Sequence, residues 1–284
     1  MYSEIYFIAD FFYEDLTGGA ELNDYSLLKY FSKNDIAVKK VHCKNVTIEF
    51  LENNRKKPFI ISNFVTLNET NKQYIRHNLN YVIYEHDHKY LRTRNPIFYK
   101  NFKAPPNDII NRDFYEKAKA VVCLTNLAVD TIEKNTGLKN IKKMGSSVWT
   151  SEDLDYIEVL LKTSKNNKYA IMDSNNPIKR TSDCIKYCKN NNLSFELISS
   201  PDHRKFLKKL SSYHGLIFMT GHLETCGRIV VEAKMLNCKV ITQEKLIGAA
   251  SESWFKKDGK KLIEEMRKIS NNSINIFIEA LNIY

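Results

Sequence analysis

Two glutamates, Glu224 and Glu232, stand eight residues apart around the stretch Thr225-Cys226-Gly227-Arg228. An apolar run precedes this stretch and a helical pattern follows it, which predicts a strand, a loop and a helix. Because a helix N-terminus points free N–H groups at anions, we expect a diphosphate at 225–228. On one continuous helix the two carboxylates lie roughly 12 Å apart along the axis. That span suits the hexose and the ribose of a nucleotide sugar, but glutamates at this spacing are also common in a chain with 27% charged residues.

A second candidate site is the loop Thr17-Gly18-Gly19-Ala20-Glu21, which follows the first apolar run and opens a helical pattern. Two adjacent glycines let the backbone approach a ligand closely, and the helix behind them presents its N-terminus. The chain has nine glycines, so a pair at this place is informative. An ordinary tight turn is the alternative interpretation.

A third candidate is Glu85-His86-Asp87-His88, at the carboxyl end of another apolar run. A histidine there can hydrogen-bond a sugar or acceptor hydroxyl, and we expect this of His86. Two histidines around an aspartate could also hold a metal ion. Since the sequence offers no identifiable third ligand, we predict sugar contact and no metal.

A fourth candidate is the basic pair Lys179-Arg180, in the loop Asp173-Ser-Asn-Asn-Pro-Ile-Lys179-Arg180 after the first strand of the second half. Such a pair can neutralise a leaving diphosphate, or it can be the solvated start of a helix.

These motifs resemble those of retaining glycosyltransferases of the GT-B class. The run Glu224-Thr-Cys-Gly-Arg-Ile-Val-Val-Glu232-Ala is similar to their E-x7-E motif, and Gly18-Gly19-Ala20-Glu21 is similar to the Gly-Gly-Ala-Glu loop of family 4. The resemblance implies that Glu232 binds the ribose of the donor and Glu224 its sugar. It implies a nucleotide-sugar donor, with UDP-hexose expected, and retention of configuration without a metal or other cofactor.

The resemblance also assigns roles to the remaining residues. His86, Lys179 and Glu224 are the expected catalytic residues, and Lys179 matches a lysine that neutralises the diphosphate. The family's arginine is replaced by Asp173 or Ser174, so either Arg180 or Arg228 substitutes or the charge is stabilised in another way. Donor contacts are expected from Gly18, Gly19, Lys179, Arg180, Thr225, Cys226, Gly227, Arg228 and Glu232. Acceptor contacts are expected from Glu21, His88, Arg92 and Arg94.

Short apolar runs alternate with helical patterns along the whole chain, which predicts an α/β fold of doubly wound parallel sheets. We expect two Rossmann-like domains with a cleft between them, as in GT-B proteins: an acceptor-side domain over 1–160 and a nucleotide-sugar-binding domain over 161–284. The last helix, 273–284, is expected to pack back on the first domain. Strands are expected at 5–10, 58–62, 81–84, 120–124, 169–172, 194–198, 215–219 and 239–242. Helices are expected at 21–32, 125–137, 182–190, 204–211, 227–236 and 257–284, the last broken near Asn271-Asn272.

Composition limits the remaining choices. No run approaches the roughly 18 apolar residues of a membrane-spanning helix, and the first strand begins without a signal-peptide pattern, so we expect a soluble cytoplasmic protein without stable membrane insertion, in the host cytoplasm if viral. The six cysteines show neither disulfide nor zinc spacing. The net charge of +10 favours polyanionic partners, or reflects lysine-rich solvated faces. The oligomeric state is not predicted.

The acceptor is left open by the sequence. Basic and aromatic residues interleave from Lys89 to Phe114, a composition suited to nucleic acid but also to an ordinary surface. A saccharide, a lipid-linked sugar and DNA with hydroxymethylated pyrimidines, as used by phage glucosyltransferases, are the acceptors we consider. A nucleic-acid-binding protein without catalysis is the further alternative.

Overall fold

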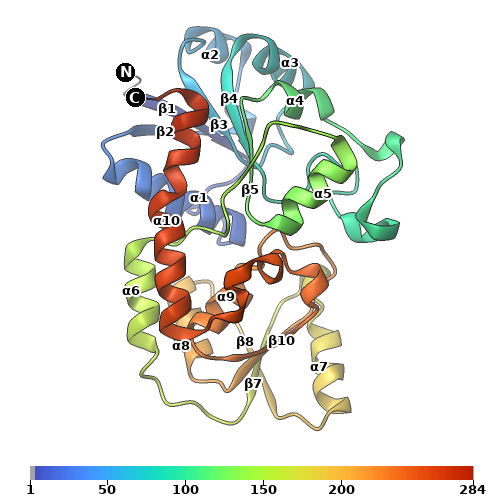
Figure 1. The fold of residues 1–284 in the computed structure, drawn as a ribbon, viewed down its shortest axis with the longest axis vertical. Helices are drawn as coiled ribbons and strands as arrows, with labels where there is room; N and C mark the ends of the chain where they lie inside the picture. Colours follow the sequence, from blue (N-terminus) through green and yellow to red (C-terminus); the bar gives the residue numbers. More distant parts are fainter. Residues whose placement is uncertain (1–3, 284) are drawn as a thin grey trace. The chain divides into compact units, whose positions relative to one another are not determined.

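The computed structural model describes residues 4–283, and within them the chain forms two compact units (Figure 1). Unit 1 comprises residues 4–148 and 269–283, and unit 2 comprises residues 149–268. Residues 1–3 and residue 284, which the expected domains included, lie outside the described residues. The expected boundary at residue 160 falls at the end of a helix of unit 2. The division into an acceptor-side and a donor-side domain stays a prediction.

Unit 1 is built on a parallel sheet whose six described strands have the order β2-β1-β3-β4-β5-β6. Strand β1 pairs with β2 on one side and β3 on the other, so the chain changes direction across the sheet at β1 and β3. The strands are β1 (Glu4–Ala9), β2 (Ala37–His42), β3 (Pro58–Ile61), β4 (Asn80–Tyr84), β5 (Val121–Cys123) and β6 (Ile141–Lys143). The helices are α1 (Gly19–Lys33), α2 (Ile48–Asn53), α3 (Glu69–Asn78), α4 (Arg112–Lys117) and α5 (Asn126–Thr136).

Apolar strands hold unit 1 together. The central strand β3 is buried along its whole length, as expected for a parallel strand covered on both faces. The C-terminal part of α10 (Gly259–Leu281) completes this core, because Phe277 packs edge-on against Tyr84 and Phe31. Asn80 also donates a hydrogen bond to the carbonyl of Leu281 (3.0 Å).

Unit 2 contains a smaller parallel sheet with the described order β10-β9-β7-β8. Here β7 pairs with β8 on one side and β9 on the other, so the change of direction lies at β7 and β9. The strands are β7 (Tyr169–Met172), β8 (Phe195–Ile198), β9 (Gly215–Phe218) and β10 (Lys239–Thr242). The helices are α6 (Ser151–Leu160), α7 (Thr181–Asn190), α8 (His203–Ser211), α9 (Arg228–Met235) and the first part of α10.

The predicted strands and helices are confirmed to within a few residues. Helix α5 begins after the N-cap Thr125 and ends at Gly137, which adopts a left-handed conformation. The two edge strands β2 and β6 were not predicted. Both are lysine-containing and largely exposed, so they lack the apolar signal of the inner strands.

Two predictions about helices need correction. Helix α6 is absent from the predicted helices, although Thr150 caps it by accepting a bond from the N–H of Asp153. The expected break at Asn271-Asn272 is wrong, since α10 runs through these residues without interruption. Buried Ile274 and Phe277 anchor the helix beyond them, and this packing outweighs the weak helix propensity of asparagine.

Candidate functional site

In unit 2, the loops after β7 and β9 meet where the sheet changes direction, the place where open α/β sheets bind ligands. The N–H of Gly221 donates to the carbonyl of Ile178 at 2.7 Å. A Cβ on Gly221 would lie 3.1 Å from Nε of Arg180, so this approach requires a glycine or a shift of the arginine. The two loops that carry the predicted donor residues are therefore in direct contact.

An ion pair joins these loops. Nζ of Lys179 lies 3.1 Å from Oε1 of Glu224, which also accepts a bond from the hydroxyl of Thr220 at 3.3 Å. Burial opposes ionisation of Glu224, but the charge and the hydrogen bond of Lys179 prevail and lower its pKa. Two residues predicted to touch the donor thus stand together, one cationic and one anionic.

Glu232 is bound by three side chains of unit 2. Its Oε1 accepts bonds from Nε1 of Trp149 (3.0 Å) and Nε of Arg228 (2.9 Å), and Nε2 of His203 lies 2.9 Å away. Burial opposes ionisation, but His203, Arg228 and Trp149 together lower the pKa of Glu232 to about 2. Within residues 4–283 the second oxygen, Oε2, accepts no hydrogen bond, so the ionised carboxylate keeps one oxygen available as an acceptor.

The placement of Glu224 differs from the continuous-helix expectation. Gly227 adopts a left-handed conformation (φ 83°), and α9 begins only at Arg228. Glu224 therefore lies in the preceding loop, where its backbone forms an isolated parallel β-bridge with Ile247. Glu232 lies about one turn into the helix. The axial separation calculated for one helix does not apply.

The other predicted donor residues of unit 2 are close to these two carboxylates in the chain but differ in exposure. Thr225, Cys226 and Arg228 are buried, and the guanidinium of Arg228 lies 4.5 Å from the ring centre of Trp149. Arg180 is half-exposed and lies 3.5 Å from Asp183. Of the two arginines expected to substitute for the family's arginine, Arg180 is thus the more accessible.

In unit 1, a chain of hydrogen bonds runs along the carboxyl edge of the sheet. His86 follows β4, and its Nε2 lies 2.9 Å from Oδ1 of Asp24 on α1. The other oxygen of Asp24 accepts a bond from the hydroxyl of Ser62, after β3, at 2.7 Å. All three side chains are buried, so the orientation of the His86 ring is fixed by groups from three elements.

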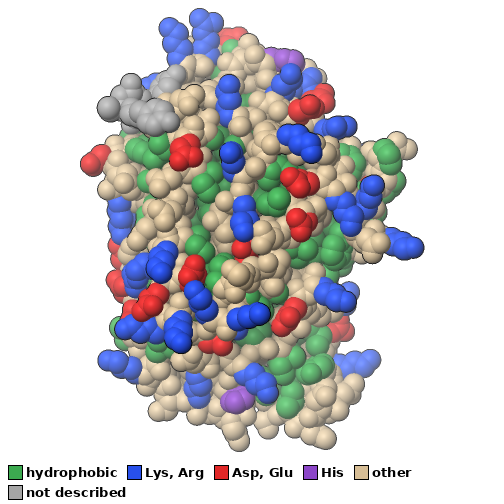
Figure 2. All heavy atoms as spheres, viewed as in Figure 1, with side chains coloured by type: hydrophobic (Ala, Val, Ile, Leu, Met, Phe, Trp, Pro, Cys, Tyr) green, Lys and Arg blue, Asp and Glu red, His purple; other side chains and the backbone are tan. Residues whose placement is uncertain are grey.

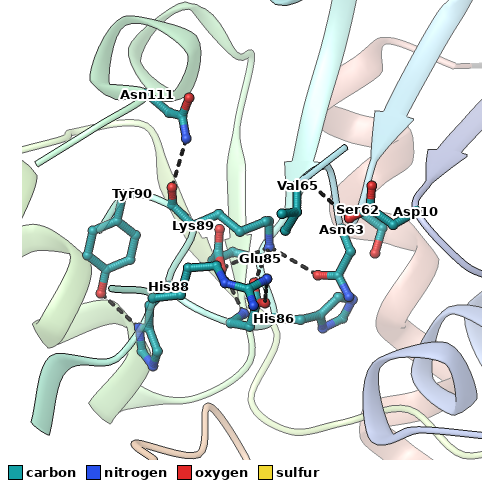
Figure 3. A network of polar contacts seen from close by, with 12 residues as sticks. Asp10, Ser62, Asn63, Val65, Glu85, His86, His88, Lys89, Tyr90 and Asn111 are labelled. Carbon is teal, nitrogen blue, oxygen red and sulfur yellow. Dashed lines mark hydrogen bonds and ion pairs between the residues drawn. The ribbon is translucent and has the colours of Figure 1, made fainter. Parts of the chain in front are cut away.

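A buried lysine organises the loop after β4 (Figure 3). Nζ of Lys89 contacts Glu85 (3.1 Å), Asp87 (2.9 Å) and Asn63 (3.2 Å), and the hydroxyl of Tyr115 also donates to Glu85. Burial raises the pKa of Glu85, but the charge of Lys89 more than offsets it, and the net shift is downward. This network joins the ends of β3 and β4 and fixes the loop that carries His86.

Glu21 has a different environment. It is buried in the first turn of α1, and its Oε2 lies so close to Gly18 that a Cβ there would come within 2.3 Å of it. Burial is the main cause of a raised pKa, and the charges of Asp24 and Asp87 add to it. Gly19, by contrast, has open space around its Cα.

The remaining predicted acceptor residues do not gather at one point. His88 is buried, with Nδ1 2.9 Å from the hydroxyl of Tyr90. Arg92 is exposed and donates to the carbonyl of Asn107. Arg94 is exposed and lies 3.2 Å from Asp87.

The sequence interpretation missed three residues that support the predicted ones: Trp149 and His203 at Glu232, and Asp24 at His86. None belongs to a motif, and each reaches its partner through the tertiary fold. The only local pattern near His203 is the preceding N-cap residue Asp202, which indicates the start of α8 but not a contact with Glu232.

No metal-binding group appears in the part of the chain that the structure describes, where no three or more His, Cys, Asp or Glu side chains are suitably arranged. The helices of the described chain include none that is long and apolar enough to cross a membrane.

Comparison with known proteins identifies similar folds among solved structures but no match in sequence. No family model matches the sequence, and no curated protein does. Among solved structures, HepE from Anabaena in complex with UDP and glucose has a TM-score of 0.54 at 12% identity, with 99% of this chain and 94% of that chain covered. A UDP-N-acetylglucosamine 2-epimerase from Rickettsia bellii has a TM-score of 0.57 at 11% identity, with 98% and 97% covered.

A third similar structure is an alpha-glucosyltransferase in complex with UDP and a 13-mer DNA containing an HMU base. Its TM-score is 0.50 at 10% identity, with 98% of this chain and 94% of that chain covered. These similarities extend over nearly the whole chain. Together with the two parallel sheets, they confirm the predicted α/β fold of the GT-B class.

Proposed function

We propose that this protein is a glycosyltransferase that moves a hexose from a nucleotide sugar, UDP-hexose, to an acceptor hydroxyl. The observation that carries the proposal is Glu232, whose Oε1 is held by three donors while Oε2 accepts no bond within the described residues. A buried, ionised carboxylate in a fixed orientation is suited to accept hydrogen bonds from a ribose. It stands at the edge of the sheet where this architecture binds ligands.

The positions of the other donor residues support the roles proposed for them. Glu224, paired with Lys179, is proposed to contact the hexose, and Lys179 and Arg180 to stabilise the diphosphate as its negative charge grows in the transition state. The stretch 225–228 is proposed to lie against the diphosphate. Retention of configuration and independence of metal are part of the proposal, as is contact of Gly18 and Gly19 with the donor.

In unit 1, we assign His86 to contact with the donor sugar or the acceptor, and Glu21, His88, Arg92 and Arg94 to the acceptor side. Glu21 suits this role by its raised pKa, since burial favours the protonated carboxyl group, which can both donate and accept a hydrogen bond with a hydroxyl. His86 suits it by its fixed orientation.

The similar structures support the donor class. HepE was solved with UDP and glucose, and the alpha-glucosyltransferase with UDP and DNA. A saccharide or lipid-linked acceptor and a hydroxymethylated DNA base are the candidates for the acceptor. The second is favoured by exposed lysines and an exposed phenylalanine within the basic segment of unit 1. We place the protein in the cytoplasm, that of the host if it is viral, without membrane insertion.

The donor test is calorimetry with UDP, GDP, ADP and their sugar conjugates on the intact chain and on Glu232→Ala and Lys179→Ala. Glu196→Ala is the matched control, because Glu196 is an exposed glutamate in unit 2. We expect saturable binding of a UDP sugar that falls more than tenfold in Glu232→Ala, less in Lys179→Ala and not in the control. Circular dichroism confirms that each variant is folded. No binding of any nucleotide by the intact chain would reject the transferase.

A further inference from the structure

Unit 1 carries a basic loop, residues 98–106, that the proposed donor chemistry does not use. Together with Lys134 of α5 it surrounds an open hollow of about 520 Å³. Three lysines line the hollow: Lys100, Lys103 and Lys134. No acidic side chain lines it among the residues that the structure describes. Figure 2 shows lysine and arginine side chains gathered where this loop projects from unit 1.

The loop is held in a constrained conformation. Asn101 and Phe102 both have positive φ angles, 53° and 61°, in the left-handed region that a bulky residue such as phenylalanine rarely adopts. Asn135 of α5 clamps the loop from both sides, donating to the carbonyl of Phe102 and accepting from the N–H of Ala104, each at 2.8 Å. Lys134 donates to the carbonyl of Asn101 at 2.7 Å. Strained backbone maintained by surrounding contacts is typical of functional surfaces.

The lysines of the loop are uncompensated, unlike the arginines before it. Arg92 lies 3.5 Å from Asp108, and Arg94 lies 3.2 Å from Asp87. Lys100 and Lys103 are exposed and form no ion pair within residues 4–283. Exposed like charges at fixed positions on one loop attract an anion that carries repeated charges.

An exposed phenylalanine near these lysines in the chain indicates which kind of anion the loop would bind. Phe98, two residues before Lys100, is 68% exposed, the largest exposure among the large apolar side chains described. An exposed aromatic ring close in the chain to exposed lysines suits a nucleic acid strand, because bases can stack on the ring while phosphates contact the ammonium groups. A lipid headgroup or an acidic peptide uses the charges but offers no such planar partner.

We propose that the 98–106 loop and Lys134 bind a nucleic acid strand, with the lysines at its phosphates and Phe98 against a base. The inference deepens the proposed function by naming nucleic acid as the class of acceptor, and this part of it rests on the proposed function. The binding itself needs no donor, so the two proposals can fail separately.

The test measures binding of a fluorescein-labelled 20-nucleotide single-stranded DNA by anisotropy, without nucleotide sugar, at several salt concentrations. The main variant is Lys100→Ala/Lys103→Ala, which leaves the Lys134 bond to the loop intact. The matched control is Lys186→Ala/Lys189→Ala, which removes the same charge from exposed positions on α7 of unit 2. A single-strand phosphate contact contributes about 0.7 to the slope of log affinity against log salt.

We expect the main variant to bind at least tenfold more weakly, with the slope reduced by about 1.4, and the control to bind within twofold of the intact chain. Phe98→Ala should weaken binding by about fivefold or more at an unchanged slope, since it removes stacking and no charge. Lys100→Arg/Lys103→Arg should retain binding.

Three outcomes would overturn the inference: equal losses in the main and control variants, no loss in either, or tighter binding to phosphatidylserine vesicles than to DNA through the same lysines. UDP binding by calorimetry on the same variants separates the proposals. If the protein binds DNA but not UDP, the nucleic-acid surface stands and the proposed transferase function is rejected. If the protein binds UDP but not DNA, the nucleic-acid surface is rejected, the transferase function stands, and a saccharide becomes the expected acceptor.

Discussion

Two buried glutamates, one in each unit, have opposite pKa shifts. Glu232 lies near the start of α9 and Glu21 in the first turn of α1, and burial raises the pKa of both. At Glu232 the donors His203, Arg228 and Trp149 reverse that effect and bring the pKa to about 2. At Glu21 the neighbouring charges of Asp24 and Asp87 reinforce it. The fold therefore fixes one carboxylate as an anion and leaves the other able to take up a proton.

Depth in the protein therefore does not decide the charge of a carboxyl group. The partners do, because a buried anion is costly unless donors and cations surround it. A network in unit 1 allows this to be tested directly, since Glu85 is buried even more fully than Glu21 but has a cation, Lys89, beside it.

Lys89→Met should have the largest effect. It removes the ammonium group that lies 3.1 Å from Glu85 and also removes a partner of Asp87, so the buried charge of Glu85 loses its compensation. We expect a loss of about 3–5 kcal/mol in the free energy of unfolding, measured by urea denaturation near pH 7.

The control is the double variant Lys89→Met/Glu85→Gln. It should recover part of the loss, because the glutamine leaves no buried anion at that position. If the single and double variants lose equal stability, packing of the lysine stem and not its charge holds the loop.

Glu232→Gln should have the next largest effect, and it should depend on pH. The folded pKa of about 2 lies below the unfolded value of 4.5, so the ionised carboxylate stabilises the fold at every pH above 4.5 by about 3 kcal/mol. This contribution is lost as pH falls from 4.5 towards 2. Urea denaturation at pH 7 and at pH 3 should show a clearly smaller difference between variant and intact chain at pH 3, and a constant difference would contradict the assigned shift.

Glu21→Gln should have the smallest effect and the opposite sign. The folded pKa is raised, so the ionised carboxylate weakens the fold as pH rises from 4.5 through that higher pKa. The variant should be more stable than the intact chain at pH 8 and equal to it at pH 4, with a difference smaller than that at Glu232. Greater stability of the intact chain at pH 8 would show that Glu21 has a cationic partner after all.

The comparison also shows what the sequence could predict. Apolar runs located the inner strands, and the carboxyl ends of those strands located Lys179, Glu224 and His86, because parallel strands bring their ends to one edge. The hydrogen-bond partners of the site residues could not be predicted from the sequence. Trp149 is 83 residues from Glu232, and His86 is 62 residues from Asp24. Neither pairing leaves a periodic or local pattern, and only the assembled sheet brings each pair together.

The helix α10 has a consequence for the order of folding during synthesis. Unit 1 is discontinuous, because residues 269–283 are made after all of unit 2. Phe277, which packs on Tyr84 and Phe31, reaches the ribosomal exit tunnel only when the rest of unit 1 has long emerged. Unit 2, by contrast, is a continuous segment that is made in one stretch. Unit 1 must wait with an open apolar surface, and a nascent chain that stalls within α10 would present that surface to chaperones.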